Sequence, residues 1–170
     1  MTNKIFIVSD FDDTIFARTN QLSKEKILRE NRWDKWNKVM KEVLGFDYMI
    51  KNYYQNKNFP QKIVNKIRNN NWIVLTAWIQ DYQFLKQKAC KLNDIEFIVV
   101  EKAEQKPKIL IEYFKKNNIQ ADLIEIYEDR PKYFIEKKEF LEKKLNTKIN
   151  IYYVEMTWNR GYKKIELIKD

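Results

Sequence analysis

The chain has 170 residues, of which 44% are hydrophobic and 34% are charged, and its formal net charge at pH 7 is +9. This length can bury one sizeable core but is short for two, so we expect a single domain over residues 1–170. The sequence has no histidine and one cysteine, Cys90, which excludes an internal disulfide, Ser-His and Cys-His catalytic dyads and the common zinc sites. Any catalysis must therefore use carboxylates, lysines or hydroxyls.

The hydropathy and charge of the chain bear on its location and partners. No run of about 18 apolar residues occurs, and the short apolar segment before Asp10 lacks the cleavage pattern of a signal peptide, so we expect a cytoplasmic protein without membrane contacts. The positive charge favours polyanionic partners, such as nucleic acid or a phosphorylated substrate. An A/T-rich coding genome would produce the same excess of lysine, so charge alone does not decide the partner.

Five short apolar segments have the composition of strands buried on both faces of a parallel sheet. They are residues 4–9, 72–75, 96–100, 123–127 and 149–154. Helical patterns separate them, and the helix start signals predict helices at 60–68, 81–91, 107–116 and 131–145. Strands that alternate with helices predict βαβ crossovers and an open parallel α/β sheet.

The longest connection between strands runs from Thr14 to Trp72 and includes apolar and aromatic residues at helical spacing. We expect a helical insertion or small cap at roughly residues 18–58, whose aromatic residues favour packing in a core or lid over the alternative, a ligand platform. Only two glycines occur, Gly45 and Gly161, so no glycine-rich nucleotide-binding loop is present.

Acidic residues follow two of the predicted strands. Asp10-Phe11-Asp12-Asp13-Thr14 comes directly after the first strand, and the pair Glu128-Asp129 follows the strand at 123–127. Open α/β sheets bind ligands at the carboxyl ends of their strands, and carboxylates there suit Mg²⁺. If the two strands are neighbours, both clusters converge on one metal; the alternative for the first cluster is an acidic helix N-cap.

Two further residues lie where they could hold a phosphoryl group. Thr76 ends the second strand, and Lys106 precedes Pro107 at the start of a predicted helix. A hydroxyl and an ammonium group are suitable phosphate ligands. Each is weak evidence alone, because threonine and lysine are common at such positions.

The order of these features resembles the four motifs of the haloacid dehalogenase (HAD) superfamily. The features are a strand followed by DxDxT, a strand ending in threonine, a lysine before a helix, and a strand followed by an acidic pair. The segments 8–16 and 126–131 resemble most the Swiss-army-knife RNA-repair-like branch of this superfamily. The resemblance covers nearly the whole chain and implies a Rossmannoid three-layer sandwich with a parallel sheet of about five strands. Ala77-Trp78 and Tyr133 depart from the pattern of that branch, which leaves the substrate open.

The resemblance also implies roles for the motif residues. Asp10 would be the nucleophile, Asp12 the general acid and base, and Thr14 would position the turn. Thr76 and Lys106 would bind the phosphoryl group, with Lys108 as the alternative lysine. Mg²⁺ would be held by Asp10, the Asp12 carbonyl, Glu128 and Asp129.

The expected activity is Mg²⁺-dependent phosphomonoester hydrolysis, with a terminal phosphate of RNA or DNA as the substrate. A phosphatase of small molecules or nucleotides, and a catalytically idle nucleic-acid-binding domain, are the alternatives. Arg130 either orients the two acids or reaches substrate phosphate. The segment 158–164 mixes aromatic and basic residues, which suits either base stacking or packing against the sheet edge.

Overall fold

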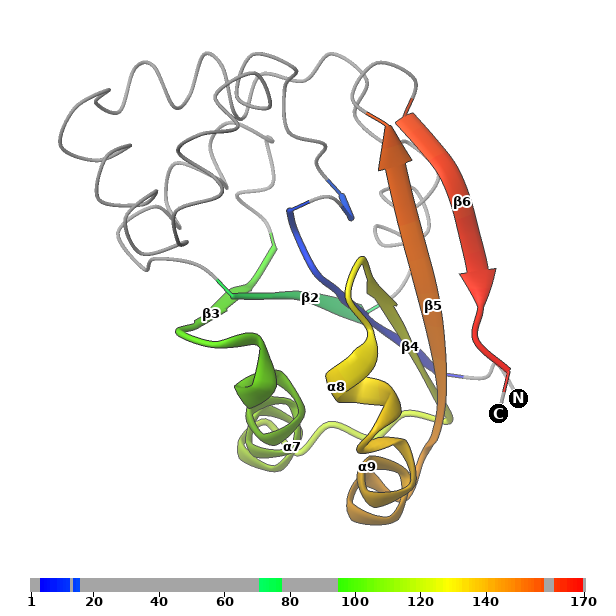
Figure 1. Ribbon diagram of the computed structural model, residues 1–170. Helices are drawn as coiled ribbons and strands as arrows, with labels where there is room; N and C mark the ends of the chain where they lie inside the picture. The colour runs from blue at the N-terminus through cyan, green and yellow to red at the C-terminus, as the bar shows by residue number, and fades with distance from the viewer. Residues whose placement is uncertain (1–3, 13, 16–70, 78–94, 158–160, 170) are drawn as a thin grey trace, which may run out of the picture.

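The computed structural model describes residues 4–12, 14–15, 71–77, 95–157 and 161–169. These residues form a six-stranded sheet in the order β3-β2-β1-β4-β5-β6 (Figure 1). The strands are β1 (Ile5–Ser9), β2 (Asn71–Ala77), β3 (Phe97–Val100), β4 (Leu123–Glu128), β5 (Lys148–Thr157) and β6 (Gly161–Leu167). Neighbouring strands are parallel except β5 and β6, which are antiparallel.

The predicted α/β class and the five parallel strands are confirmed, and the sheet has one strand more than expected. This sixth strand, β6, is formed by residues 161–167, which pair with β5 at the edge of the sheet. The sequence left two alternatives for the segment 158–164, base stacking and packing against the sheet edge. For residues 161–164, the structure shows pairing at the sheet edge. Residues 158–160 lie outside the described part of the chain.

The described helices are η4 (Ala103–Gln105), α7 (Lys106–Lys116), α8 (Lys132–Ile135) and α9 (Lys138–Leu145), and α7 to α9 cover the same face of the sheet (Figure 1). The predicted helix at 107–116 is confirmed and begins one residue earlier, with Pro107 in its first turn, where a missing N–H costs no helical hydrogen bond. The prediction of a single helix at 131–145 is wrong, because the structure has two helices there, α8 and α9. The helical segment is interrupted at Lys137, whose φ of −115° and ψ of 8° leave the helical region.

Both faces of β1 are buried, which explains why its sequence is continuously apolar rather than alternating. On the face toward the helices, Phe6 packs edge-on against Phe114 of α7, with ring centroids 4.8 Å apart. On the opposite face, Ile7 and Ser9 of β1 are completely buried, as is Val74 of β2, which pairs with Ser9. The main core cluster toward the helices comprises Phe6, Val8, Ile73, Leu75, Val100, Leu110, Phe114, Ile124, Ile126, Phe134, Leu141, Ile149 and Ile151.

Several predictions concern residues that the structure does not describe. The helices expected at 60–68 and 81–91, and the insertion expected at 18–58, lie outside the described residues. Among the described helices, none is long and apolar enough to cross a membrane.

Candidate active site

The acidic residues after β1 and β4 meet at the point where the strand order reverses. β1 lies between β2 and β4, and the register pairs Ser9 of β1 with Tyr127 of β4. The Asp10 N–H extends this pairing by donating a 2.9 Å hydrogen bond to the Tyr127 carbonyl. Asp10 and Glu128 are therefore neighbours at the carboxyl edge of the sheet, where open α/β sheets bind their ligands.

Hydrogen bonds to the Phe11 carbonyl hold Thr14 and Ile15 close to the end of β1. The N–H groups of Thr14 and Ile15 donate to the Phe11 carbonyl at 3.3 and 3.0 Å. Phe11 and Ile15 are completely buried, and the Phe11 ring lies 5.5 Å from the ring of Phe97 in β3. Apolar anchors on both sides of the turn thus keep its polar residues near the end of β1.

Lys106 joins the two acidic clusters. Its ammonium lies 3.0 Å from Asp10 Oδ1 and donates a 2.6 Å hydrogen bond to Glu128 Oε2, and its side chain is only 3% exposed. Lys108, the alternative lysine, is 80% exposed and contacts Glu112 on the surface of α7. Of the two lysines, Lys106 is therefore the one that the fold brings to the acidic residues.

Burial and the ion pairs act in opposite directions on Asp10 and Lys106. Burial by itself would raise the pKa of Asp10, but the nearby Lys106 charge and its hydrogen bond outweigh it and lower this pKa. Burial would likewise lower the pKa of Lys106, but Asp10 and Glu128 outweigh it and raise this pKa. Both groups are therefore charged at neutral pH, which keeps Asp10 in the form that a nucleophile needs.

Asp10, Glu128 and Asp129 form a cluster that could hold a metal ion. One carboxylate oxygen from each lies within 4.8 Å of the others. Burial and the charge of Asp10 raise the pKa of Glu128 well above its ordinary value, and the same causes raise that of Asp129 to about 6. The crowded negative charge would be relieved by a hard divalent cation, whose preferred ligands are carboxylate oxygens.

The remaining predicted residues also lie near this edge of the sheet. Asp12 is half-buried, Thr14 is completely buried, and Thr76 lies two residues beyond the residue of β2 that pairs with Ser9. Thr76 Oγ1 is buried without a hydrogen-bond partner among the described residues. Burying such a hydroxyl is costly unless a ligand or water binds it, so Thr76 is suited to donate a hydrogen bond to a phosphate group.

Arg130 contacts the cluster from the solvent side. Its Nε lies 3.6 Å from Asp129 Oδ2, and its side chain is 76% exposed. Such an exposed pair contributes little to stability. The guanidinium can therefore orient Asp129 while most of it remains open to solvent, so both predicted roles remain compatible with its position.

A second buried polar group, on the opposite face of β4, is not among the residues predicted from the sequence. The Tyr127 hydroxyl donates a 2.9 Å hydrogen bond to the buried carboxylate of Glu125, and the Tyr127 ring stacks on Tyr152 of β5 at 4.8 Å. The signal that could have found this group is Glu125 itself, a charged residue within an otherwise apolar strand.

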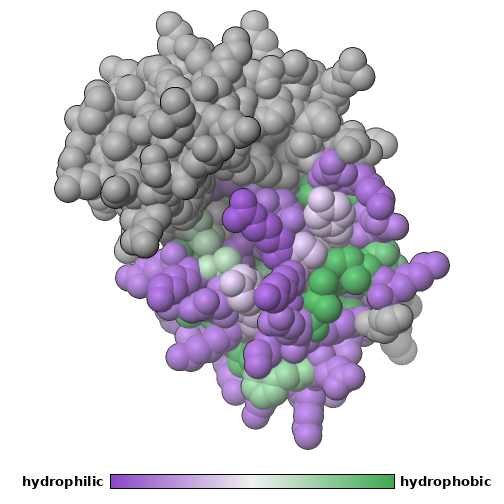
Figure 2. Space-filling model, in the orientation of Figure 1, coloured by the Kyte–Doolittle hydropathy of each residue, from purple (hydrophilic) through white to green (hydrophobic). Residues whose placement is uncertain are grey.

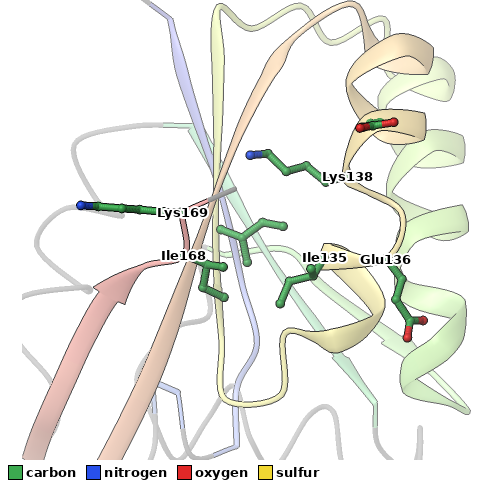
Figure 3. Close-up of a pocket in the computed structure, with 7 residues that line it drawn as sticks. Ile135, Glu136, Lys138, Ile168 and Lys169 are labelled. Atoms are coloured by element: carbon green, nitrogen blue, oxygen red, sulfur yellow. The ribbon is translucent and has the colours of Figure 1, made fainter.

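A separate cavity of about 400 Å³ lies between the α8–α9 region, the strand β5 and the two residues that follow β6, Ile168 and Lys169. Figure 2 shows apolar side chains on this side of the molecule bordered by hydrophilic ones. Ile135 and Ile168 lie beside this cavity, with Lys138 and Lys169 close by (Figure 3). No residue of the acidic cluster lines it, so this cavity is not the place where the carboxylates meet.

The fold and the site define the protein as an α/β protein with a mostly parallel sheet and a buried carboxylate cluster, capable of holding a metal ion, at the reversal of the strand order. Comparisons of the chain with protein-family models, curated proteins and solved structures found no match.

Proposed function

We propose that the chain is a Mg²⁺-dependent phosphomonoester hydrolase of the HAD type, with Asp10 as the nucleophile. The observation that carries this proposal is the contact of buried Asp10 with Lys106 at 3.0 Å, beside carboxylates that could share a metal ion. An ionised carboxylate held at the end of a parallel strand is suited to nucleophilic attack. The order of the four sequence motifs agrees with the same reaction.

The residues present fit a magnesium ion. Asp10, Glu128 and Asp129 would provide three oxygen ligands, and the pKa values of the last two are raised by burial and by the charge of Asp10, which a cation would offset. We propose the Asp12 carbonyl as a further ligand. When bound, Mg²⁺ offsets the repulsion between Asp10 and the phosphate and stabilises the charge of phosphoryl transfer.

The proposed reaction proceeds in two displacements at phosphorus. Asp10 attacks the phosphorus atom and forms an aspartyl-phosphate, while the substrate alcohol leaves with a proton from Asp12. Asp12 then takes a proton from water, which attacks the same phosphorus, releases phosphate and restores the Asp10 carboxylate. The lowered pKa of Asp10 supports this assignment, because the first step requires its ionised form.

Thr76 and Lys106 are assigned to the phosphoryl group. The buried Thr76 hydroxyl, which has no partner among the described residues, would donate a hydrogen bond to a phosphoryl oxygen. Lys106 would stabilise the charge that develops near Asp10, because its ammonium already lies beside that carboxylate. Both groups are buried, so their interactions with phosphate are weakly screened by solvent.

The proposed substrate is a terminal phosphate of RNA or DNA, as the resemblance to RNA-repair-like domains and the net charge of +9 favour. Acidic and basic residues are nearly balanced over the described residues, so most of the excess positive charge lies elsewhere in the sequence. This near-balance over the described residues favours the second candidate, a small-molecule or nucleotide phosphatase. A catalytically idle binding domain is the third.

The test is Mg²⁺-dependent phosphate release from a 3′-phosphorylated oligonucleotide, a 5′-phosphorylated oligonucleotide and an aryl phosphate. Asp10→Asn should reduce release by at least about a thousandfold, because it removes the nucleophile. The exposed control variant Asp122→Asn, which keeps an acceptor for the Lys4 N–H, should retain full activity.

Each outcome decides between the candidates. Preference for one oligonucleotide end, with activity that falls as salt rises, supports the repair function. Activity on the aryl phosphate alone supports a small-molecule phosphatase. Full activity of Asp10→Asn would refute the mechanism, and no activity with any substrate would favour the binding domain.

A further inference from the structure

The outer edge of β6 is a surface that the proposed hydrolase activity does not use. β6 is the last strand of the sheet, and no strand of the described chain pairs with its outer edge (Figure 1). Lys164 and Glu166 are exposed and contact each other along the strand, and Leu167 is 41% exposed. An open edge strand is a template for pairing with another strand.

The register with β5 shows which backbone groups of β6 point outward. Ile168 donates its N–H to the Ile151 carbonyl at 2.9 Å, and the antiparallel register continues without a break from these two residues to Lys164, beyond which the pairing shifts by one residue at a bulge. Hydrogen-bonded and non-hydrogen-bonded pairs alternate in antiparallel strands. Residues 164, 166 and 168 therefore bond to β5, and Ile165 and Leu167 direct their N–H and C=O groups to the outer edge.

We propose that a second copy of this chain pairs with this edge, its β6 running antiparallel about a two-fold axis at Ile165. The outward-facing groups of Ile165 would then bond to those of Ile165 in the other copy. Lys164 would lie opposite Glu166 at the two flanking positions. Opposite charges at directly facing positions stabilise antiparallel pairs, and like charges there destabilise them.

The charge pattern selects this register over its neighbours. Moving the axis to Lys164 keeps the outward groups paired but places two lysines opposite each other. Moving it to Glu166 places two glutamates opposite each other. Sliding one strand along the other by a single residue would instead place outward-facing groups opposite groups that point away from the contact. Of these registers, the one about Ile165 therefore satisfies both the hydrogen bonds and the charges.

The two faces of the strand also suit this arrangement. Ile165 pairs with the buried Val154 of β5, and Leu167 pairs with Tyr152, so both lie on the same face of the sheet. Pairing about this axis would place Ile165 of one copy directly opposite Ile165 of the other on this face. The contact is small for a protein interface, so we expect a dissociation constant on the order of 10 μM or weaker.

The test is sedimentation velocity of the full chain over a range of concentrations at low salt. The wild-type chain should move from 21.0 kDa toward twice that mass as concentration rises. Lys164→Glu alone, or Glu166→Lys alone, should remain monomeric, because each places like charges across the axis. An equimolar mixture of these two variants should dimerise again, because opposite charges then face each other at both positions.

The controls separate this pairing from general charge effects. Lys143→Glu makes the same charge change on an exposed position of α9 and should dimerise like the wild type. A monomeric wild-type chain at every concentration would overturn the proposal. It would also be overturned by dimerisation of both single variants, or by a mixture of the two that remains monomeric.

Discussion

At the scale of single residues, Lys106 is the group on which the site depends most. It is buried, and it contacts two carboxylates that come from different strands, Asp10 after β1 and Glu128 at the end of β4. Removing one partner of a buried ion pair leaves charge without compensation, and this costs more than the intact pair contributes to stability. Lys106 therefore serves the fold as well as the proposed reaction.

Lys106→Met should lower the free energy of unfolding by about 3 kcal/mol, because the two carboxylates lose their buried cation. Lys108→Met is the matched control on the same helix, and it should change stability by less than about 1 kcal/mol, since Lys108 is exposed. Urea denaturation measures both values. Equal effects of the two substitutions would contradict the central position of Lys106.

At the scale of secondary-structure elements, α7 connects the core to the site. Its Leu110 and Phe114 are buried against the sheet, and Lys106 at its first position reaches the acidic cluster. Packing of the apolar face thus fixes where the ammonium group lies. After β4 in the chain, α8 and α9 lead to β5 through the left-handed residue Asn146, which follows α9.

Asn146 provides a test of this helix end. Its φ of 50° and ψ of 44° are left-handed, and its N–H donates to the Glu142 carbonyl. Asn146→Ala should destabilise the protein by about 1 kcal/mol, because a Cβ without a compensating polar group disfavours this conformation. Asn146→Gly should leave stability unchanged or slightly higher. Equal unfolding midpoints in urea for the two variants would show that the backbone angle is not limiting.

At the scale of the whole molecule, we expect the acidic cluster to make global stability depend on pH and, if it holds the proposed metal, on Mg²⁺. The folded chain raises the pKa of Asp129 to about 6 from an ordinary value of 3.8, so between these values the folded state binds more protons than the unfolded state. The stability from this group is therefore complete below the lower value and is lost as pH rises through about 6.

Without metal, the wild type should lose stability relative to Asp129→Asn as the pH rises from about 4 to about 7. The difference between their free energies of unfolding should change by on the order of 1 to 3 kcal/mol over this range. With excess Mg²⁺ the trend should reverse, because the proposed metal would bind the ionised carboxylate and so stabilise the folded state. Urea denaturation at a series of pH values measures both. A difference that is constant over pH, with and without Mg²⁺, would argue against a shared cluster.

Much of the fold could be predicted from local composition. The run Ile5-Phe6-Ile7-Val8 indicated a strand buried on both faces, and Pro107 marked the start of α7 to within one residue. The acids after two strands indicated a carboxylate edge, because strand ends in an open sheet are where ligands bind. These features depend on residues near each other in the chain, so the sequence alone determined them.

Other features depended on contacts between distant parts of the chain. The neighbouring positions of β1 and β4, which bring Asp10 to Glu128, follow from the strand order, and no local pattern specifies that order. The orientation of α7 on the core decided that Lys106 enters the cluster while Lys108 faces solvent. The interruption at Lys137 and the pairing of β6 with β5 were likewise decided by tertiary structure, because packing overrides weak local preferences.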